Sequence, residues 1–266
     1  MSLWKREAAW LAIDLEAAHF YPSVGGRSRK TPVEIRANFK QSPSDSAQRV
    51  AQAVKKHHAK VGALNIVLSD RLVRYLVVPP VHGLRNADEL HQAAIARHAQ
   101  VFGDDTAHWR VTTDMEISSE RHLSCAVELQ ILESLTQAFM GVGIRIRTIQ
   151  PAFVAIQRML HKSVKSLPVW IVAVTGSSIT TGYKDAQGWA GVRVHQRVIG
   201  GISELVSLLQ IDRLYFCPAA MGAQAVWVSG LEAGDDSGIE SGEWQLEYLR
   251  TPSFLTAEKQ DSETLA

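Results

Sequence analysis

The sequence predicts an α/β protein in which one structural plan is used twice. Short apolar runs with the composition of strands alternate with longer amphipathic runs that have the period of helices. Two segments, LAIDLEAAHFYPS from residue 11 and WIVAVTGSSITTGY from residue 170, resemble each other, because each consists of an apolar strand, a short turn and a second strand. We therefore expect mixed sheets that begin with β-hairpins and are flanked by helices.

Periodicity and stop signals define the elements of the first hundred residues. Val50, Val54 and Val61 form one apolar stripe, which predicts an amphipathic helix over 45–60 with a basic end. Asn86 followed by Glu89 is a capping-box pattern, and the helix that it begins should end at Gly103. The expected strands are 11–15, 18–22, 33–39, 64–68 and 72–78, of which the last two form a hairpin across the Ser69-Asp70 turn. A basic, glycine-containing loop occupies 24–30.

The same signals continue to the end of the chain. We expect helices that end at Gly141, begin after Pro151 (152–161) and follow Gly200-Gly201 (202–210). The expected strands are 109–115, 122–129, 144–149, 169–174, 179–183, 189–195, 214–217, 225–228 and 244–249. The polar segment 163–168 ends in proline and is the expected boundary between a first half, 1–162, with an inserted hairpin–helix subdomain, and a second half, 163–255. A disordered acidic tail, 256–266, follows.

Composition and charge exclude several classes of protein. The chain has 266 residues, of which 46% are hydrophobic and 21% charged, as in ordinary globular proteins. Its formal net charge of +1 argues against binding to nucleic acid. No run approaches the ~18 apolar residues of a membrane helix, so we expect no direct membrane span. Cys125 and Cys217 lie in apolar runs, which is typical of reduced, buried thiols in a cytoplasmic protein.

Polar residues do not form a pattern that indicates catalysis or metal binding. His57 and His58 are adjacent on a predicted helix, so their side chains point ~100° apart. His91 and His98 share a helix face but lie ~10 Å apart along its axis, which is too far to share a metal ion. We expect no metal site and no catalytic residues.

Five arginine and aromatic residues are candidates for binding a partner. Residue types of this kind are favoured at binding hot spots. They lie on or next to two predicted strands and could together bind a peptide. Alternatively, the aromatic residues are core and the arginines are solvated, and composition alone favours this second reading. The five are Arg71, Arg74, Tyr75, Trp109 and Arg110.

Three local runs resemble the cytoplasmic actin-like components of type II secretion and type IV pilus platforms, the GspL and PilM families. Residues 64–80 (LNIVLSDRLVRYLVVPP) are similar to their strand pair, and 141–160 (GVGIRIRTIQPAFVAIQRML) to the strand, proline and interdomain helix that close the first half. Residues 169–191 stand where the second phosphate hairpin would be. The resemblance implies an actin-like (ribonuclease H-like) duplicated fold. The second half is reduced, because only one helix fits between His195 and Leu214.

The phosphate hairpins of that fold are degenerate here. In the fold, a glycine lets the backbone approach phosphate and an aspartate holds Mg²⁺ through water. The first hairpin keeps Asp14 but has Glu16 where glycine is needed, and the second keeps Gly176 and Thr180 but has Val174 in place of the aspartate. We therefore expect that neither ATP nor another cofactor binds. A simple hairpin turn is the alternative reading of 175–178.

The resemblance implies a non-catalytic scaffold, cytoplasmic and peripheral to the inner membrane through its partners. Its implied partners are an inner-membrane platform protein, which contributes a short cytoplasmic segment to a groove on the first half, and the motor ATPase. The sequence leaves the oligomeric state open, a homodimer included. Two alternatives remain: an active small ATPase or sugar kinase of the same fold, and a soluble adaptor unrelated to secretion.

Overall fold

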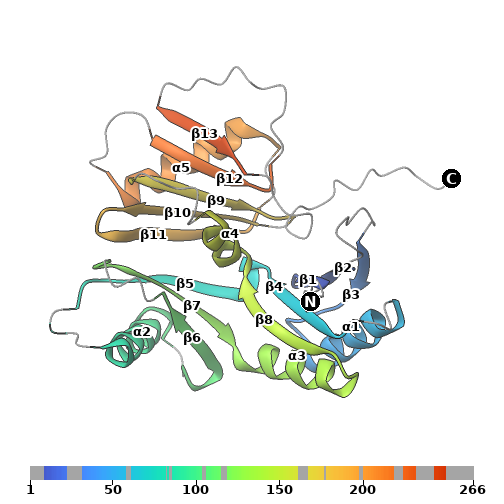
Figure 1. Ribbon diagram of the computed structural model, residues 1–266. Helices are drawn as coiled ribbons and strands as arrows, with labels where there is room; N and C mark the ends of the chain where they lie inside the picture. The colour runs from blue at the N-terminus through green and yellow to red at the C-terminus, as the bar shows by residue number, and fades with distance from the viewer. Residues whose placement is uncertain are drawn as a thin grey trace, which may run out of the picture.

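The computed structural model describes residues 9–22, 32–57, 61–81, 83, 86–103, 106–114, 119–160, 167–176, 178–197, 200–218, 224–231 and 243–249. The strands of these residues form three sheets (Figure 1), here called the N-terminal, small and C-terminal sheets. The predicted loop 24–30 and tail 256–266 lie outside the described residues, and so does most of the predicted boundary 163–168.

The N-terminal sheet combines a three-stranded antiparallel meander with two parallel strands. Its order is β3-β2-β1-β4-β8. Neighbours β3, β2 and β1 are antiparallel, whereas β4 pairs parallel with β1 and β8 pairs parallel with β4. The strands are β1 (Ala9–Ile13), β2 (Ala17–Tyr21), β3 (Val33–Arg36), β4 (Ala63–Leu68) and β8 (Arg145–Pro151).

The C-terminal sheet repeats this plan. Its order is β11-β10-β9-β12-β13, again an antiparallel meander followed by two parallel strands. The predicted duplication is therefore confirmed at the level of sheet topology. The strands are β9 (Val169–Val174), β10 (Ile179–Asp185), β11 (Gly188–His195), β12 (Gln224–Ser229) and β13 (Trp244–Tyr248).

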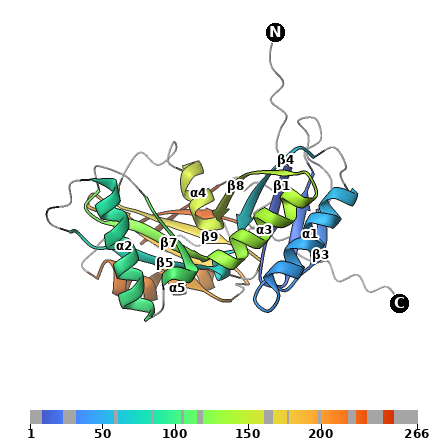
Figure 2. The ribbon, with the colours of Figure 1, turned by 90° about the horizontal axis from the view of Figure 1, so that it is seen from below.

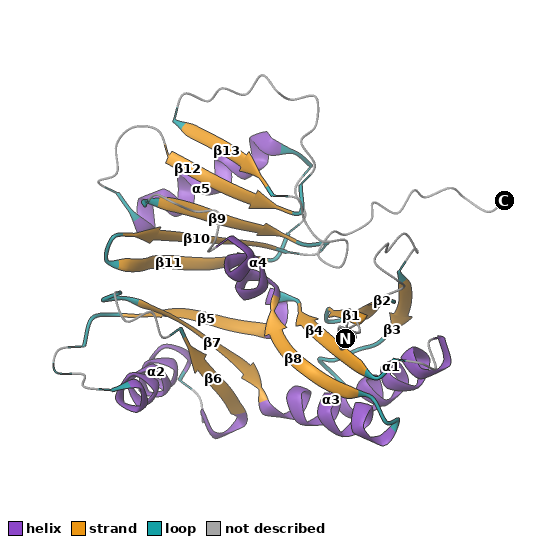
Figure 3. Cartoon of the chain, in the orientation of Figure 1, coloured by secondary structure: helices purple, strands orange, loops and turns teal. Residues whose placement is uncertain are grey.

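The small sheet, β5-β7-β6, is formed by the part of the chain that separates β4 from β8 in the sequence. It consists of β5 (Val73–Val78), β6 (Trp109–Thr113) and β7 (His122–Glu128), and helix α2 (Ala87–Phe102) covers one face (Figure 3). The side chain of Asn86 accepts a hydrogen bond from Glu89 N at 2.9 Å, and Gly103 ends the helix at φ +69°. Both predicted helix ends are thus confirmed.

The predicted hairpin across Ser69-Asp70 is wrong. β4 is a central strand of the N-terminal sheet, with β1 on one side and β8 on the other, so no place remains beside it for β5. The chain instead turns through the short 3-10 helix η1 (Asp70–Leu72) and enters the small sheet. Ser69 N donates to Ile13 O at 2.7 Å, which fixes this turn to the end of β1.

Helices cover the large sheets. α1 (Pro43–His57) and α3 (Leu129–Gly141) lie side by side on the N-terminal sheet (Figure 2), and α5 (Ile202–Phe216) packs on the C-terminal sheet. The strand predicted at 214–217 is wrong, because α5 continues to Phe216. Buried Leu209 and Asp212 extend its inner face, and the Phe216 ring stacks on Trp170 with 5.8 Å between centroids.

The remaining α-helix, α4 (Ala152–Leu160), lies between the two large sheets (Figure 1). Four of its five buried residues belong to one apolar cluster with side chains from strands of all three sheets, here called the junction cluster. Its members are Val67, Leu123, Ala152, Phe153, Ile156, Leu160, Ile171, Ala173 and Trp189. None of the described helices is long and apolar enough to cross a membrane.

The small sheet is also attached to the C-terminal sheet, since edge strands β5 and β11 run side by side (Figure 1). Arg121, at the start of β7, forms an ion pair with Asp185 of β10. Trp189 Nε1 donates to Asp114 Oδ2 at 2.9 Å. A Cβ at Gly188 would lie 2.3 Å from Arg121 O, so only glycine permits this approach.

Candidate functional site

The turn of the first hairpin, between β1 and β2, uses Asp14 for its own structure. Asp14 N donates to Ala17 O at 2.8 Å, and Asp14 Oδ1 accepts from Leu15 N at 2.8 Å. The other carboxylate oxygen lies 3.9 Å from Arg71 Nη1, so its counter-charge is a guanidinium of the chain itself. Glu16 is exposed at the tip of the turn. A carboxylate at that place repels an approaching phosphate.

The second hairpin, between β9 and β10, closes its turn with hydroxyl groups. Thr175 N donates to Ser178 O at 2.9 Å, and Thr175 Oγ1 lies 2.9 Å from Ser178 Oγ. Ser178 is fully buried, whereas Gly176 is exposed in the turn. The two hydroxyls therefore hydrogen-bond within the turn.

The end of β9 is covered by the turn after β12. Gly230 has φ +91°, and a Cβ at this position would lie 1.9 Å from the carbonyl oxygen of Val174. This glycine lets two backbone segments meet, and the Val174 side chain beside it is buried.

A buried carboxylate, Asp70, connects the second hairpin to Phe153 of the junction cluster. Asp70 Oδ1 accepts hydrogen bonds from Tyr75 Oη at 2.6 Å and from Phe153 N at 3.1 Å, and Asp70 Oδ2 accepts from Thr180 Oγ1 at 2.7 Å. Asp70 is 1% exposed and Thr180 is fully buried. The four residues belong to η1, β5, α4 and β10, so one side chain ties the first turn of α4 and the C-terminal sheet to the end of β4.

Burial and hydrogen bonding act on Asp70 in opposite directions. Burial raises the pKa of Asp70 above its ordinary value, and the donors Tyr75, Thr180 and Phe153 N partly lower it again. Burial, together with the nearby Asp70 charge, raises the pKa of Tyr75, so its hydroxyl remains a donor. The carboxylate therefore serves as a structural acceptor.

Aromatic rings fill the space next to Asp70. The Phe153 ring lies 5.9 Å from Tyr75 and 5.6 Å from Trp189, measured between centroids. Gly182 of β10 permits this packing, because a Cβ there would lie 2.5 Å from Phe153 Cζ.

Sequence reasoning identified Thr180 but not its partner. Asp70 was read as a turn residue, and the only signal was one acidic residue between the apolar runs of β4 and β5. Among the residues described, no group of three or more His, Cys, Asp or Glu side chains could hold a metal ion.

The five candidate partner-binding residues do not share one face. Arg74 and Trp109 meet: the Arg74 guanidinium lies 3.9 Å from the Trp109 ring centroid and 4.9 Å from that of Phe102. Tyr75 follows Arg74 on the strand and so points to the opposite face, toward Asp70. Arg71 pairs with Asp14, and Arg110 is exposed on β6.

Trp109 also lines an open concavity of ≈ 500 Å³, where the small sheet meets the start of α3. The lining combines an aromatic ring with two exposed carboxylates, Glu128 and Glu133. The other lining residues are Ala107, His108, Leu129 and Gln130. We call this concavity the Trp109 groove.

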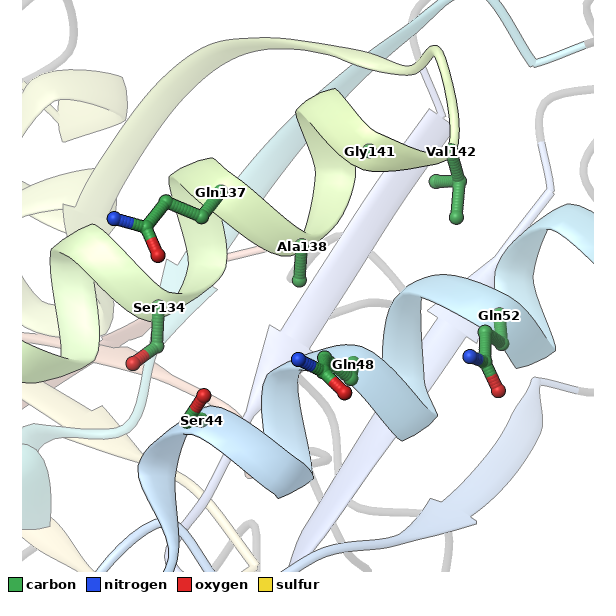
Figure 4. Close-up of a pocket in the computed structure, with 8 residues that line it drawn as sticks. All are labelled: Ser44, Gln48, Gln52, Ser134, Gln137, Ala138, Gly141 and Val142. Atoms are coloured by element: carbon green, nitrogen blue, oxygen red, sulfur yellow. The ribbon is translucent and has the colours of Figure 1, made fainter.

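A second groove, of ≈ 290 Å³, runs between α1 and α3 (Figure 4). None of the described residues that line it is charged. Its walls are Ser44, Gln48 and Gln52 on α1 and Ser134, Gln137, Ala138, Gly141 and Val142 at α3. We call it the glutamine groove.

Comparison with known proteins identifies the fold. No family model and no curated protein sequence matches the chain. Solved structures do. The cytoplasmic domain of EpsL, an inner-membrane component of the type II secretion system of Vibrio cholerae, is similar with TM-score 0.57 and 9% identity, over 91% of this chain and 89% of that one.

Two further structures are similar over comparable lengths. One is the PilM–PilN type IV pilus biogenesis complex, with TM-score 0.60, 13% identity and coverage of 91% and 88%. The other is a Bacteroides thetaiotaomicron protein with an actin-like ATPase fold and unknown function, with TM-score 0.54, 11% identity and 92% of both chains covered. The chain therefore has the actin-like fold that the sequence predicted.

Proposed function

We propose that this protein is a non-catalytic actin-like scaffold of a type IV pilus or type II secretion-like assembly platform. In this role it binds the cytoplasmic segment of an inner-membrane partner and, at a separate surface, the motor ATPase. Its similarity in fold to the EpsL cytoplasmic domain and to the PilM–PilN complex supports the proposal.

The proposal that the protein is not a catalyst rests mainly on the hydrogen bond that Thr180 donates to Asp70. A phosphate-binding hairpin needs free hydroxyl and N–H donors directed toward its ligand. The Thr180 hydroxyl instead donates to Asp70 at 2.7 Å in a fully buried position. A nucleotide phosphate that took this donor would leave the Asp70 carboxylate short of a partner, and its own negative charge would add repulsion.

We place the partner segment in the Trp109 groove. Trp109 offers an aromatic surface, and Glu128 and Glu133 supply negative charge at the rim. Cytoplasmic segments next to membrane helices carry an excess of lysine and arginine. A basic segment would thus find charge complementarity beside the Trp109 ring, one face of which already carries the Arg74 guanidinium at 3.9 Å.

Calorimetry with Mg·ATP at millimolar concentration tests the non-catalytic part. We expect no heat of binding and no rise in melting temperature. A ligand at ~100 times its Kd would stabilise the fold by ~2.7 kcal/mol, which a melting curve detects. Binding that disappears in Asp14→Ala would establish a working nucleotide site and overturn this part of the proposal.

Peptide titration tests the partner site. The probe is the cytoplasmic segment of the PilN-like protein from the same organism, labelled with a fluorophore and followed by anisotropy. We expect Trp109→Ala to weaken binding by at least tenfold, because aromatic residues dominate hot spots. Glu128→Gln with Glu133→Gln should weaken it less and reduce its salt dependence. Gln137→Ala in the glutamine groove is the matched control, and an equal effect there would place the segment elsewhere.

A further inference from the structure

Strand β8 forms one edge of the N-terminal sheet. It pairs with β4 and, among the described residues, with no other strand (Figure 1). An edge strand presents a row of N–H and C=O groups that an added strand can pair with. The register of β8 also shifts at Arg147: Ile146 lies opposite Leu64 and Thr148 opposite Asn65, so Arg147 has no partner residue on β4. The backbone of this edge therefore offers hydrogen bonds to an extended segment.

Three arginines give this edge a charge of one sign. Arg145 and Arg147 are exposed on β8, and Arg158 is exposed on α4. Arg158 Nη1 donates to Gln150 Oε1 at 3.2 Å, which holds the third guanidinium beside the other end of the strand. None of the three forms an ion pair with a described residue. We call them the β8 arginines.

The opposite edge of the same sheet differs, because β3 exposes charges of both signs, Glu34 and Arg36. Charged side chains on an edge usually protect it from pairing with another chain. On β8, where the charges are all positive, the protection is selective. Like charges oppose the pairing of β8 with β8 of a second copy, whereas carboxylates on an incoming strand are attracted.

The β8 arginines extend along the whole strand. Arg145 and Gln150 are five positions apart, so ~17 Å of strand separates them, which is the length of about six residues of an added strand. Every second side chain of that strand points to the same face, and carboxylates there can accept charge-assisted hydrogen bonds from guanidinium groups. An anionic membrane surface has no backbone groups to offer, so the free edge favours a peptide. We propose that the β8 edge binds an acidic, extended segment of a partner protein, which adds a strand to the N-terminal sheet.

This surface is separate from the Trp109 groove. The groove is lined by residues of the small sheet and α3, and neither β8 nor α4 contributes to its described lining. The charges are also opposite, since the groove has carboxylates at its rim and the β8 edge has arginines. The two surfaces therefore select different segments.

Fluorescence anisotropy with a labelled decapeptide of alternating glutamate and threonine tests this inference on the full chain. We expect binding that saturates below ~1 mM, as for a weak interface, and no binding of the same peptide with lysine in place of glutamate. Arg145→Glu with Arg147→Glu should weaken binding by about tenfold or more, because each reversal replaces an attraction by a repulsion. Arg36→Glu, at the exposed arginine of β3, is the matched control and should leave binding unchanged. Unaltered melting temperatures would show that both variants are folded.

A peptide methylated at every backbone nitrogen separates strand addition from attraction between charges alone. It keeps all the carboxylates but has no N–H donors, so we expect it not to bind. The inference is overturned if the acidic peptide does not bind, if the lysine peptide binds equally well, if the β8 reversals have no effect, or if the methylated peptide still binds. Trp109→Ala, which probes the proposed partner groove, should leave binding of the acidic peptide unchanged, so the two proposals can fail separately.

Discussion

Replacing Thr180 with valine tests whether Asp70 joins the C-terminal sheet to the rest of the molecule. Valine keeps the shape of threonine but removes the hydroxyl that donates to Asp70 Oδ2 at 2.7 Å. Because both residues are buried, water cannot replace the lost donor. A hydrogen bond to a charged group contributes ~1.5–3 kcal/mol, so we expect the free energy of unfolding to fall by about 2 kcal/mol.

Urea unfolding followed by tryptophan fluorescence measures this loss. Thr148→Val is the matched control: its hydroxyl donates to Asn65 Oδ1 at 3.1 Å in an exposed site, and we expect a change below ~0.5 kcal/mol. A double-mutant cycle with Asp70→Asn should give a coupling energy of ~1 kcal/mol or more, since the two side chains are in contact. If the free energy of unfolding falls no more in Thr180→Val than in Thr148→Val, the Thr180–Asp70 bond does not have the stabilising role given to it here.

The dependence of the Thr180→Val effect on pH offers an independent check. Burial raises the pKa of Asp70, so the folded state binds this proton more tightly than the unfolded chain does. The contribution of Asp70 to stability is therefore fully present below its ordinary pKa and is lost as the pH rises through the raised value. The Thr180 donor favours the charged carboxylate, so its removal should destabilise the protein more above the raised pKa of Asp70 than below the ordinary value.

Two further outcomes follow from close contacts and burial. Gly182→Ala should destabilise the fold by ~1–3 kcal/mol, since its Cβ would lie 2.5 Å from Phe153 Cζ, whereas Gly141→Ala, with nothing within 4 Å, should change the melting temperature little. Burial and the nearby Arg74 lower the pKa of His98 to about 4, so the folded state binds fewer protons than the unfolded chain between that value and the ordinary 6.5. Stability should fall by on the order of 3 kcal/mol as the pH drops through this window, and urea unfolding at several pH values should show a flatter profile in His98→Gln.

Local signals in the sequence were sufficient to predict most elements. The capping residues Asn86 and Glu89 and the stop at Gly103 act within one helical turn, so their outcome does not depend on the rest of the fold. The two strand–turn–strand openings are similarly local, and their similarity predicted the duplicated sheets.

The pairing of strands that are far apart in the chain could not be predicted from the sequence. Nothing in the runs of β4 and β5 indicates that they enter different sheets, because the competitors for pairing with β4 are β1 and β8, about 50 and 80 residues away. The strand predicted at 214–217 failed for another reason: an apolar run was read as a strand, whereas α5 continues through it to Phe216 and leaves Leu214 and Tyr215 exposed.

The candidate site residues stay predictions, and Asp70, which the structure joins to one of them, was missed. Asp14, Glu16, Val174, Gly176 and Thr180 suggested a hairpin pair without phosphate chemistry. Asp70 became visible only in three dimensions, because its partners Tyr75, Phe153 and Thr180 lie 5, 83 and 110 residues away. A carboxylate between two apolar runs has no sequence pattern that separates a structural acceptor from a turn residue.

The bonding around Asp70 explains why the hairpins can persist without a ligand. In the first hairpin, Asp14 bonds within its own turn, and β1 and β9 remain central strands of their sheets whatever the turns bind. Contact between the sheets then comes from Asp70, Thr180 and the Phe153 ring. A carboxylate held by three donors and sealed by aromatic rings has few alternative arrangements, because each opened bond leaves a buried polar group without a partner. The two large sheets are therefore joined through buried hydrogen bonds that are costly to open.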